Sequence, residues 1–293
     1  MTQRPASRPV PADELARIAA DAAHAGARAI DAELAAARAA GHALDRRTKS
    51  GPADFVTAAD LASERAILAA LGAARPADDV LAEESGDHPG GRADDTGRAP
   101  LRWLVDPIDG TLNFVHGRAD FAISIGVEPV PPDSTTRPGP PAGQDAIAGA
   151  VLQPGLGRLF AAGATPLAEL NAAPLQVSKC ERLADALVGV GYPQGRPARL
   201  RAHTWLGSLL SSLRDYRRIG SAACDLVNVA TGVQDGYLAF GVKPWDIGAG
   251  FALVRAAGGE AGWAATASGR DVAVAGTAAV YAGLVELVAE CEV

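Results

Sequence analysis

The chain has 293 residues, a formal net charge of −7 and three cysteines. The acidic balance argues against a surface that binds nucleic acid, because such surfaces carry a basic stripe. The cysteines lie far apart, which excludes a paired disulfide framework or a zinc-type spacing and favours a reducing cytoplasm. We expect no signal peptide and no membrane span, since no run of about 18 apolar residues occurs.

Two helices are expected first. Between Pro11 and Ala40, apolar residues recur at alternating steps of three and four, which predicts one long amphipathic helix. A second helix is predicted from Thr57 to Leu71, entered through Thr57 or Asp60 as its N-cap. The segment Lys49 to Asp54 between them is typical of a loop.

Strands dominate the next part of the chain. A short strand is predicted at Asp79 to Leu81 and a buried one at Leu101 to Val105, with a polar, glycine-rich surface loop, Gly86 to Pro100, between them. A short helical turn at Asn113–His116 and a strand at Phe121–Glu128 are expected next. A proline-rich surface connection at Pro129–Gln144 then leads to a hairpin with strands at Ala146–Gln153 and Gly157–Ala162.

In the second half, short strands alternate with helices. The strands are expected at Ala186–Gly191, Arg217–Ile219 and Tyr237–Phe240, and the helices at Ala202–Leu213, Ala222–Thr231, Asp246–Ala257 and Ala278–Glu290. This alternation predicts an α/β protein with layered helices and sheets. Because no repeat or convincing linker occurs, we expect one domain over residues 1–293, with halves of about 1–165 and 166–293.

The strongest local signal follows the buried strand, at Asp106-Pro107-Ile108-Asp109-Gly110-Thr111. Two carboxylates three residues apart can face one point there. The proline fixes the turn, and the glycine frees the backbone so that N–H groups near Thr111 open toward the same point. A helix start of this kind binds phosphate. Taken alone, the simpler interpretation is a turn with capping aspartates.

Other acidic segments change that balance. Glu83 and Glu84 come just after a predicted strand, Asp60 lies near the start of the second helix, and Asp246 begins an apolar helix. Taken alone, Asp246 is an ordinary N-cap. Glu84 is interpreted as a surface or supporting carboxylate.

Together with Ile219-Gly220-Ser221-Ala222-Ala223, these segments resemble the inositol monophosphatase family of magnesium-dependent, lithium-sensitive sugar phosphatases. The resemblance runs from Lys49 to Gly259 in the same order and spacing. It implies alternating helix and sheet layers, a homodimer, a small phosphorylated substrate and two or three Mg²⁺ ions.

The resemblance also implies roles for individual residues. The Mg²⁺ ligands would be Glu83, Asp106, the main-chain carbonyl of Ile108, Asp109 and Asp246. Thr111, hydrogen-bonded to Asp60, would orient the attacking water, and Glu83 would act as its base. Substrate contacts would come from Gly110, Thr111, Gly220, Ser221 and Ala222.

The chemistry of these residues agrees with such a site. All the expected ligands are oxygens, which hard cations such as Mg²⁺ prefer. Two carboxylates about 4 Å apart repel by about 4 kcal/mol at an effective dielectric near 20, so the cluster needs cations or protons. Two ions can clamp both the incoming water and the leaving oxygen, which predicts direct hydrolysis without a phosphoenzyme.

Three questions stay open in the sequence. Ala239 occupies the position where inositol-specific family members have a glutamate that binds substrate hydroxyls, so the substrate is open. The candidates are inositol monophosphate or a related polyol phosphate, histidinol phosphate, and a 3'(2'),5'-bisphosphate nucleotide. A metal-binding interaction scaffold with little catalysis is the alternative of another class. Arg217 and Arg218 are interpreted as solvated charge, although either could approach the substrate or a neighbouring subunit.

Overall fold

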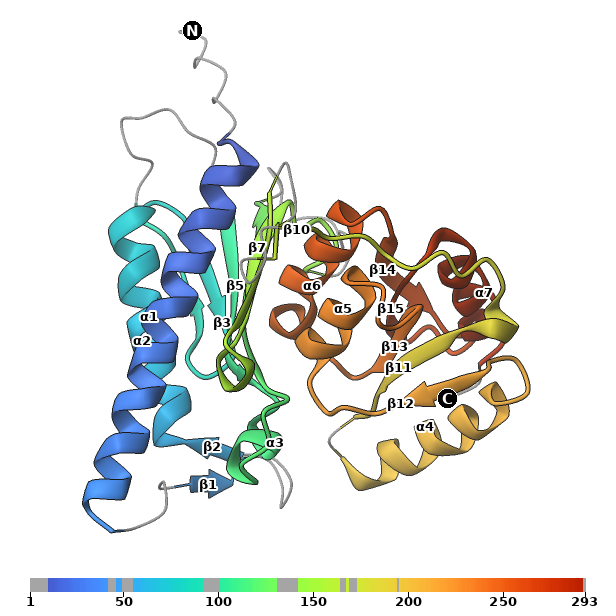
Figure 1. Cartoon of the computed structure of the whole chain (residues 1–293), viewed down its shortest axis with the longest axis horizontal. Coiled ribbons are helices and arrows are strands. Elements are labelled where there is room, and N and C mark those ends of the chain that lie inside the picture. The colour runs from blue at the N-terminus through green and yellow to red at the C-terminus, as the bar shows by residue number, and fades with distance from the viewer. Residues whose placement is uncertain are drawn as a thin grey trace, which may run out of the picture.

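The computed structural model describes residues 10–41, 46–48, 55–91, 101–130, 142–163, 167–168, 173–193 and 195–291. Helices and sheets alternate across the molecule, with two sheets separating three layers of helices (Figure 1). The expected layered α/β architecture is therefore confirmed. Among the described helices, none combines the length and apolarity that a bilayer crossing requires.

The first half of the chain forms an eight-stranded sheet whose outer face is covered by α1 (Ala12–Ala39) and α2 (Ala58–Ala74). The strand order is β10-β9-β8-β7-β6-β5-β3-β4. A small separate sheet pairs β1 (Arg46–Thr48) with β2 (Phe55–Thr57). The strands of the large sheet are β3 (Asp79–Ala82), β4 (Gly86–His88), β5 (Leu101–Asp109), β6 (Ala122–Pro129), β7 (Ala148–Gln153), β8 (Arg158–Ala162), β9 (Leu167–Ala168) and β10 (Ala173–Pro174).

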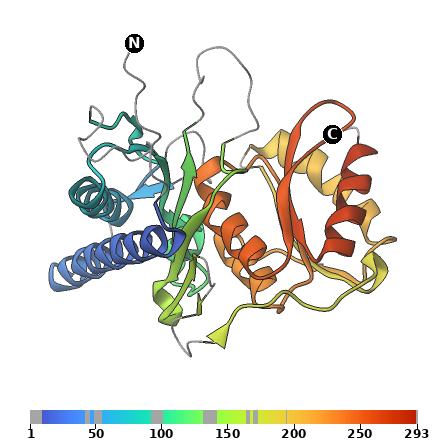
Figure 2. The ribbon, with the colours of Figure 1, turned by 90° about the horizontal axis from the view of Figure 1, so that it is seen from above.

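The second half forms a five-stranded sheet in the order β12-β11-β13-β15-β14. Seen from above, α5 (Ala222–Ala230) and α6 (Pro244–Ala256) lie between the two sheets (Figure 2). The outer face of the second sheet carries α4 (Arg196–Leu209) and α7 (Ala278–Ala289). The strands are β11 (Leu187–Gly191), β12 (Asp215–Arg217), β13 (Gly236–Phe240), β14 (Glu260–Ala265) and β15 (Asp271–Gly276), and a short helix, α3 (Thr111–Val115), follows β5.

Small residues let α6 approach the first sheet closely. A Cβ on Gly126 of β6 would lie 2.7 Å from the backbone nitrogen of Ala249, and one on Gly149 of β7 would lie 3.0 Å from the Ala249 Cα. Real Cβ atoms do not come this close to backbone atoms, so a larger side chain at either position would push the helix away. These glycines therefore allow the second turn of α6 to lie against the sheet that carries β5.

Most predicted elements are confirmed, with shifted ends. The long first helix, the second helix, the hairpin and the terminal helix occur where the pattern places them. The expected helical turn begins at Thr111 rather than Asn113, and the buried strand continues through Asp109. Residues 86–88 form β4 inside the segment predicted as loop.

Other predictions for the second half were wrong. α4 begins at Arg196, six residues before the expected start at Ala202. The strand expected at Arg217 to Ile219 lies at Asp215–Arg217 instead, and β14 and β15 were not predicted. The loop at 49–54 and most of the proline-rich connection, 131–141, lie outside the described residues.

Candidate metal centre and active site

Asp106 and Asp109 reach the same side of β5 through an irregularity in the strand. Asp106 pairs with Ser124 and Asp109 with Ala122, so three steps along β5 match two along β6. In a regular strand, residues three apart point to opposite faces, and the extra residue removes that alternation. Asp106 is buried, and its Oδ1 accepts the N–H of Ile108 at 3.0 Å. The turn thus brings both carboxylates toward one point.

The start of α5 holds Asp109 in place. Its Oδ2 accepts hydrogen bonds from the Ser221 hydroxyl and the Ala223 N–H, both at 2.6 Å. Ser221 is also the N-cap of α5, because its Oγ accepts the N–H of Cys224 at 3.2 Å. One oxygen of Asp109 is therefore committed to the helix, and the other can bind a ligand in the site.

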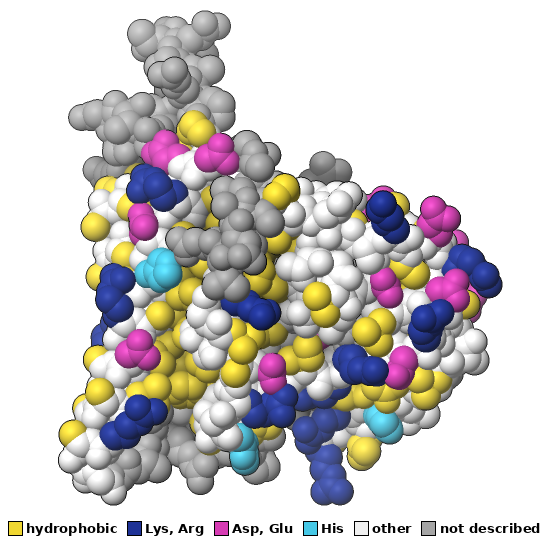
Figure 3. Space-filling view, viewed as in Figure 1, with side chains coloured by type: hydrophobic (Ala, Val, Ile, Leu, Met, Phe, Trp, Pro, Cys, Tyr) yellow, Lys and Arg dark blue, Asp and Glu magenta, His cyan; other side chains and the backbone are white. Residues whose placement is uncertain are grey.

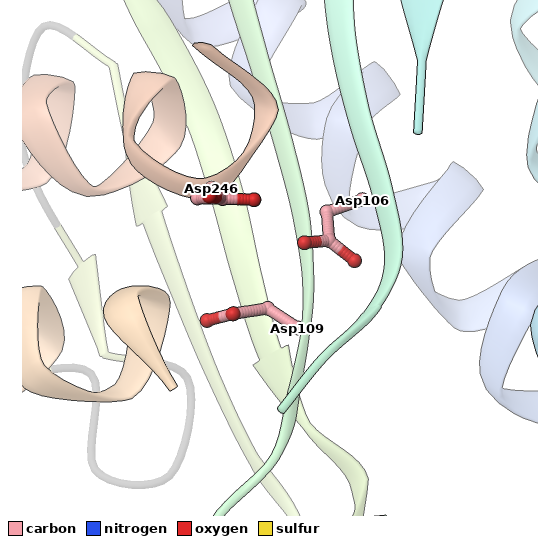
Figure 4. A group of neighbouring side chains, drawn as sticks. All are labelled: Asp106, Asp109 and Asp246. Carbon is pink, nitrogen blue, oxygen red and sulfur yellow. The ribbon is translucent and has the colours of Figure 1, made fainter. Parts of the chain in front are cut away.

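Asp246 comes from the first turn of α6. Its Oδ2 accepts the N–H of Lys243 at 2.7 Å, which caps the helix. Figure 4 shows its carboxylate facing those of Asp106 and Asp109. Oxygen atoms from the three side chains lie within 4.8 Å of one another. Residues from two distant segments thus form one acidic group that could hold a metal ion.

Glu83 lies beside this group, in the turn after β3. Its N–H donates to the carbonyl of Val105 at 3.0 Å, which attaches the turn to β5. Its side chain lines the same cavity as the three aspartates, and it is hydrogen-bonded to Asp106. Three of the four expected carboxylates therefore converge in one group, and the fourth adjoins Asp106.

Burial and mutual repulsion raise the pKa of the aspartates. The pKa of Asp106 is raised well above its usual value, first by burial and then by the charges of Glu83, Asp109 and Asp246. Burial is also the largest cause that raises the pKa of Asp246, and burial raises that of Asp109 to about 6 despite its hydrogen bonds to α5. The all-anionic cluster is unfavourable by itself, and a bound cation would relieve it.

One turn of α2 supports the site at three points. Asp60 Oδ1 lies 3.3 Å from the Thr111 hydroxyl, while its Oδ2 accepts the N–H of Thr57 at 2.8 Å. Ser63 Oγ donates to the carbonyl of Pro107 at 3.2 Å. Glu64, which is buried, accepts the N–H of Glu84, next to Glu83, at 2.8 Å. The pairing of Asp60 with Thr111 is present as expected, whereas no pattern in the sequence singles out Ser63 or Glu64.

Thr111 and Asn113 tie α3 to its surroundings. The Thr111 hydroxyl also lies 3.1 Å from the carbonyl of Ile108, so its single proton can go to that oxygen or to Asp60. Asn113 Nδ2 donates to the carbonyls of Asp120 at 2.7 Å and Ile219 at 3.0 Å. Sequence reasoning missed the bridging role of Asn113, because its partner before α5 is 106 residues away.

Gly110 permits the close contact between α3 and the start of α5. Its φ is 91°, in the left-handed region that favours glycine. A Cβ there would lie 3.1 Å from the Cβ of Ser221 and 3.4 Å from the carbonyl oxygen of Gly220. The turn after β5 can therefore lie directly against the segment that anchors Asp109.

A cavity of about 600 Å³ opens beside the carboxylates. Gly110, Thr111, Gly220, Ser221 and Ala222 all line it, together with Glu83, the three aspartates and Ile108. Other residues from the second half of the chain also line it: Val190, Gly191, Tyr192, Arg199, Arg218, Asp225, Tyr237, Gly241, Val242, Lys243 and Trp245.

Ala239 of β13, which replaces the glutamate of inositol-specific family members, is fully buried and does not line the cavity. It lies on the same face of the strand as Tyr237, which does. The two arginines expected as solvated charge differ from each other. Arg217 pairs with Asp215 at 2.6 Å, whereas Arg218 lines the cavity.

The sequence and the fold were compared with known proteins. The model of the inositol monophosphatase family matches residues 12–290. An inositol-1-monophosphatase from Mesorhizobium japonicum is 37% identical over 210 residues, 71% of this chain and 72% of that protein. A protein named Nus factor SuhB from Salmonella typhimurium is 35% identical over 215 residues, 72% of this chain and 73% of the other.

Solved structures agree with the sequence matches. The extragenic suppressor protein suhB from Bartonella henselae superposes with a TM-score of 0.75 at 29% identity, covering 94% of this chain and 99% of that one. The inositol monophosphatase from Anabaena gives a TM-score of 0.70 at 27% identity, covering 94% and 95%. The chain therefore belongs to the inositol monophosphatase family and is a phosphoric monoester hydrolase.

Proposed function

We propose that this enzyme hydrolyses a small phosphate monoester with Mg²⁺ in the cavity beside Asp106, Asp109 and Asp246. The observation that carries the proposal is the convergence of these buried carboxylates within 4.8 Å at the cavity wall. Inositol monophosphate or a related polyol phosphate is the first substrate to consider, because relatives at 37% and 38% identity are named inositol-1-monophosphatase.

The proposed metal ligands fit hard cations. Asp106, Asp109, Asp246, Glu83 and the Ile108 carbonyl would together hold two or three Mg²⁺ ions, and all of them offer oxygen. The raised pKa values of the three aspartates support this assignment, because a cation would stabilise their ionised forms. When bound, the ions supply positive charge that offsets the carboxylates and the substrate phosphate, and they acidify water.

The chain's own residues would position the reactants. The Thr111 hydroxyl, held near Asp60, orients the attacking water, and Glu83 accepts its proton. The N–H groups of Gly110 and Thr111, and the loop Gly220-Ser221-Ala222, bind phosphate and substrate oxygens at the cavity wall. The phosphoryl group passes directly to water, without a covalent intermediate on the protein.

Phosphate release from inositol 1-monophosphate provides the test. Wild-type enzyme is assayed with Mg²⁺ and with a chelator, beside Asp106→Asn, which keeps the shape of the side chain but removes its charge. We expect activity only with Mg²⁺, and a loss of about 10²-fold or more in the variant, typical of a lost electrostatic contribution to catalysis. Activity that survives both chelation and the substitution would refute the proposed metal centre. A panel with histidinol phosphate and a 3'(2'),5'-bisphosphate nucleotide identifies the preferred substrate.

The quaternary structure and a second role are part of the proposal. We infer a single domain, since α5 and α6 share one apolar core with residues of both sheets. We also infer a cytoplasmic location and a homodimer, and the mass of the protein in solution tests the dimer. Because relatives at 35% identity are named Nus factor SuhB, an interaction scaffold is the second candidate. Asp106→Asn separates the two, since a scaffold would keep its cellular role without catalysis.

A further inference from the structure

Three basic residues line the same cavity as the carboxylates. Arg199 of α4, Arg218 before α5 and Lys243 before α6 all line it. Figure 3 shows Lys and Arg side chains gathered near the start of α4 on this side of the molecule. Within the described part of the chain, none of the three forms an ion pair shorter than 4.0 Å. Among the described residues, three basic side chains therefore line the cavity without a carboxylate within 4.0 Å.

Neighbouring arginines outside the cavity behave differently. Arg217 lies 2.6 Å from Asp215, and Arg214 lies 3.7 Å from Asp185. These two arginines are thus paired with carboxylates, whereas Arg218 has no carboxylate within 4.0 Å among the described residues. Arg217 offers a matched control for Arg218, because the two are adjacent and both exposed but only one lines the cavity.

Arg218 is held in a defined place. Its guanidinium carbon lies 5.4 Å from the centroid of the Tyr192 ring, which also lines the cavity. A Cβ on Gly220 would lie only 2.9 Å from Arg218 Nη1, so the glycine leaves room for the guanidinium over the loop. Stacking on an aromatic face leaves the N–H groups at the guanidinium edge available to an anion. The side chain is thus positioned before any substrate arrives.

One buried carboxyl group, that of Asp225, lies close enough to Arg218 for the two charges to interact. Asp225 lines the cavity, is buried, and accepts a hydrogen bond from Gln234 Nε2 at 3.1 Å. Burial raises the pKa of Asp225 to about 8 while the charge of Arg218 lowers it, and this single carboxyl group does not balance three cations. From β13, Tyr237 lines the cavity and Ala239 adds no acceptor. This end of the cavity is therefore net positive.

We propose that the preferred substrate carries a second anionic group, phosphate or carboxylate, which Arg218 binds with help from Arg199 and Lys243. This inference rests on the proposed function, because the first phosphate must occupy the carboxylate side of the cavity. Guanidinium groups bind phosphate and carboxylate through charge-assisted, often bidentate hydrogen bonds. A neutral polyol body offers only hydroxyl oxygens, whose hydrogen bonds with these cations are weaker than those of a second anion.

The test compares three substrates at fixed Mg²⁺ and ionic strength: a polyol monophosphate, the same polyol with a second phosphate, and a phosphorylated hydroxy acid. We measure kcat and KM for wild type, Arg218→Ala, Arg218→Gln and the control Arg217→Ala. In wild type, we expect a lower KM for both doubly anionic substrates. A charge-assisted hydrogen bond corresponds to about ten- to a hundredfold in affinity. In both Arg218 variants, the KM for the doubly anionic substrates, divided by the KM for the monophosphate, should therefore rise by about this factor.

The control and the outcomes are distinct. Arg217→Ala should leave the ratio of KM values unchanged, because an exposed ion pair contributes little. An unchanged ratio in the Arg218 variants, or equal KM for all substrates in wild type, would overturn the inference and leave the phosphatase proposal standing. A preference for only one of the phosphate and carboxylate substrates identifies the group that is bound. If no substrate releases phosphate, the proposed function fails, and the inference fails with it.

Discussion

Asp109→Asn tests the energetic description of the carboxylate cluster. The substitution keeps an oxygen that can accept the bonds from Ser221 and Ala223 and removes one negative charge. Burial raises the pKa of Asp109 to about 6. Relative to an ordinary aspartate near 3.9, a shift of about two units corresponds to about 3 kcal/mol of destabilisation at pH 7.5 without metal.

The sign of the pH dependence follows from the direction of the shift. The folded protein binds this proton more tightly than the unfolded chain, so the stabilisation is present below about pH 4 and is lost as the pH rises through about 6. In a chelator, Asp109→Asn should therefore be more stable than wild type at pH 7.5, by up to about 3 kcal/mol, and by about half as much at pH 5.

Urea unfolding in chelator at pH 5 and pH 7.5 measures these differences, with Asp21→Asn as the control. Asp21 lies on α1 in an exposed ion pair with Arg17, where loss of charge has little effect. With Mg²⁺ the wild type should be more stable than Asp109→Asn, because the variant has lost a charged ligand. If Asp109→Asn is less stable than wild type at pH 7.5 in chelator, with no gain between the two pH values, the claim that burial and repulsion disfavour the ionised Asp109 is refuted.

Three further substitutions test the geometry of the site. Thr111→Val should lower kcat by about 10²-fold with little change in KM, because it removes the hydroxyl near Asp60, and Thr111→Ser should restore activity; steady-state kinetics measure both. Ser221→Ala should raise the Mg²⁺ concentration for half-maximal activity by about tenfold, because it removes one of the two hydrogen bonds that hold the Asp109 oxygen, and equal titrations would contradict this role. Gly110→Ala should lower the free energy of unfolding by about 1–2 kcal/mol, because φ is 91° there, and unchanged urea unfolding would argue against this strain.

The sequence predicted the parts of the fold that are encoded locally. β5 and its turn were recognised because an apolar run ends in a proline and a glycine within one short segment. β14 and β15 were missed because their residues are mostly alanine, glycine and valine without a clear alternation, and pairing with each other and with β13 decides their state. The start of α4 was predicted too late in the chain, because its first turns contain arginines and show no apolar period.

The site was predicted as a list of residues, and its supports were not. The aspartates and Glu83 stood out because carboxylates beside turns suggest chemistry. Glu64 did not, because a glutamate inside a helix is usually a surface charge, and its partner, the Glu84 N–H, is twenty residues away. Arg218 was interpreted as solvated charge, since only the folded structure shows that it lines the cavity while Arg217 does not.

The turn of α2 that carries Asp60, Ser63 and Glu64 has a consequence for how the enzyme becomes active. It links hydroxyl, carbonyl and amide groups that lie 51, 44 and 20 residues away in sequence. Docking of this one helix therefore aligns the turn after β3 and the turn after β5 at once. During folding, competence for catalysis should emerge as a late, single step that coincides with protection of the α2 amides from hydrogen exchange, rather than growing gradually with the sheets.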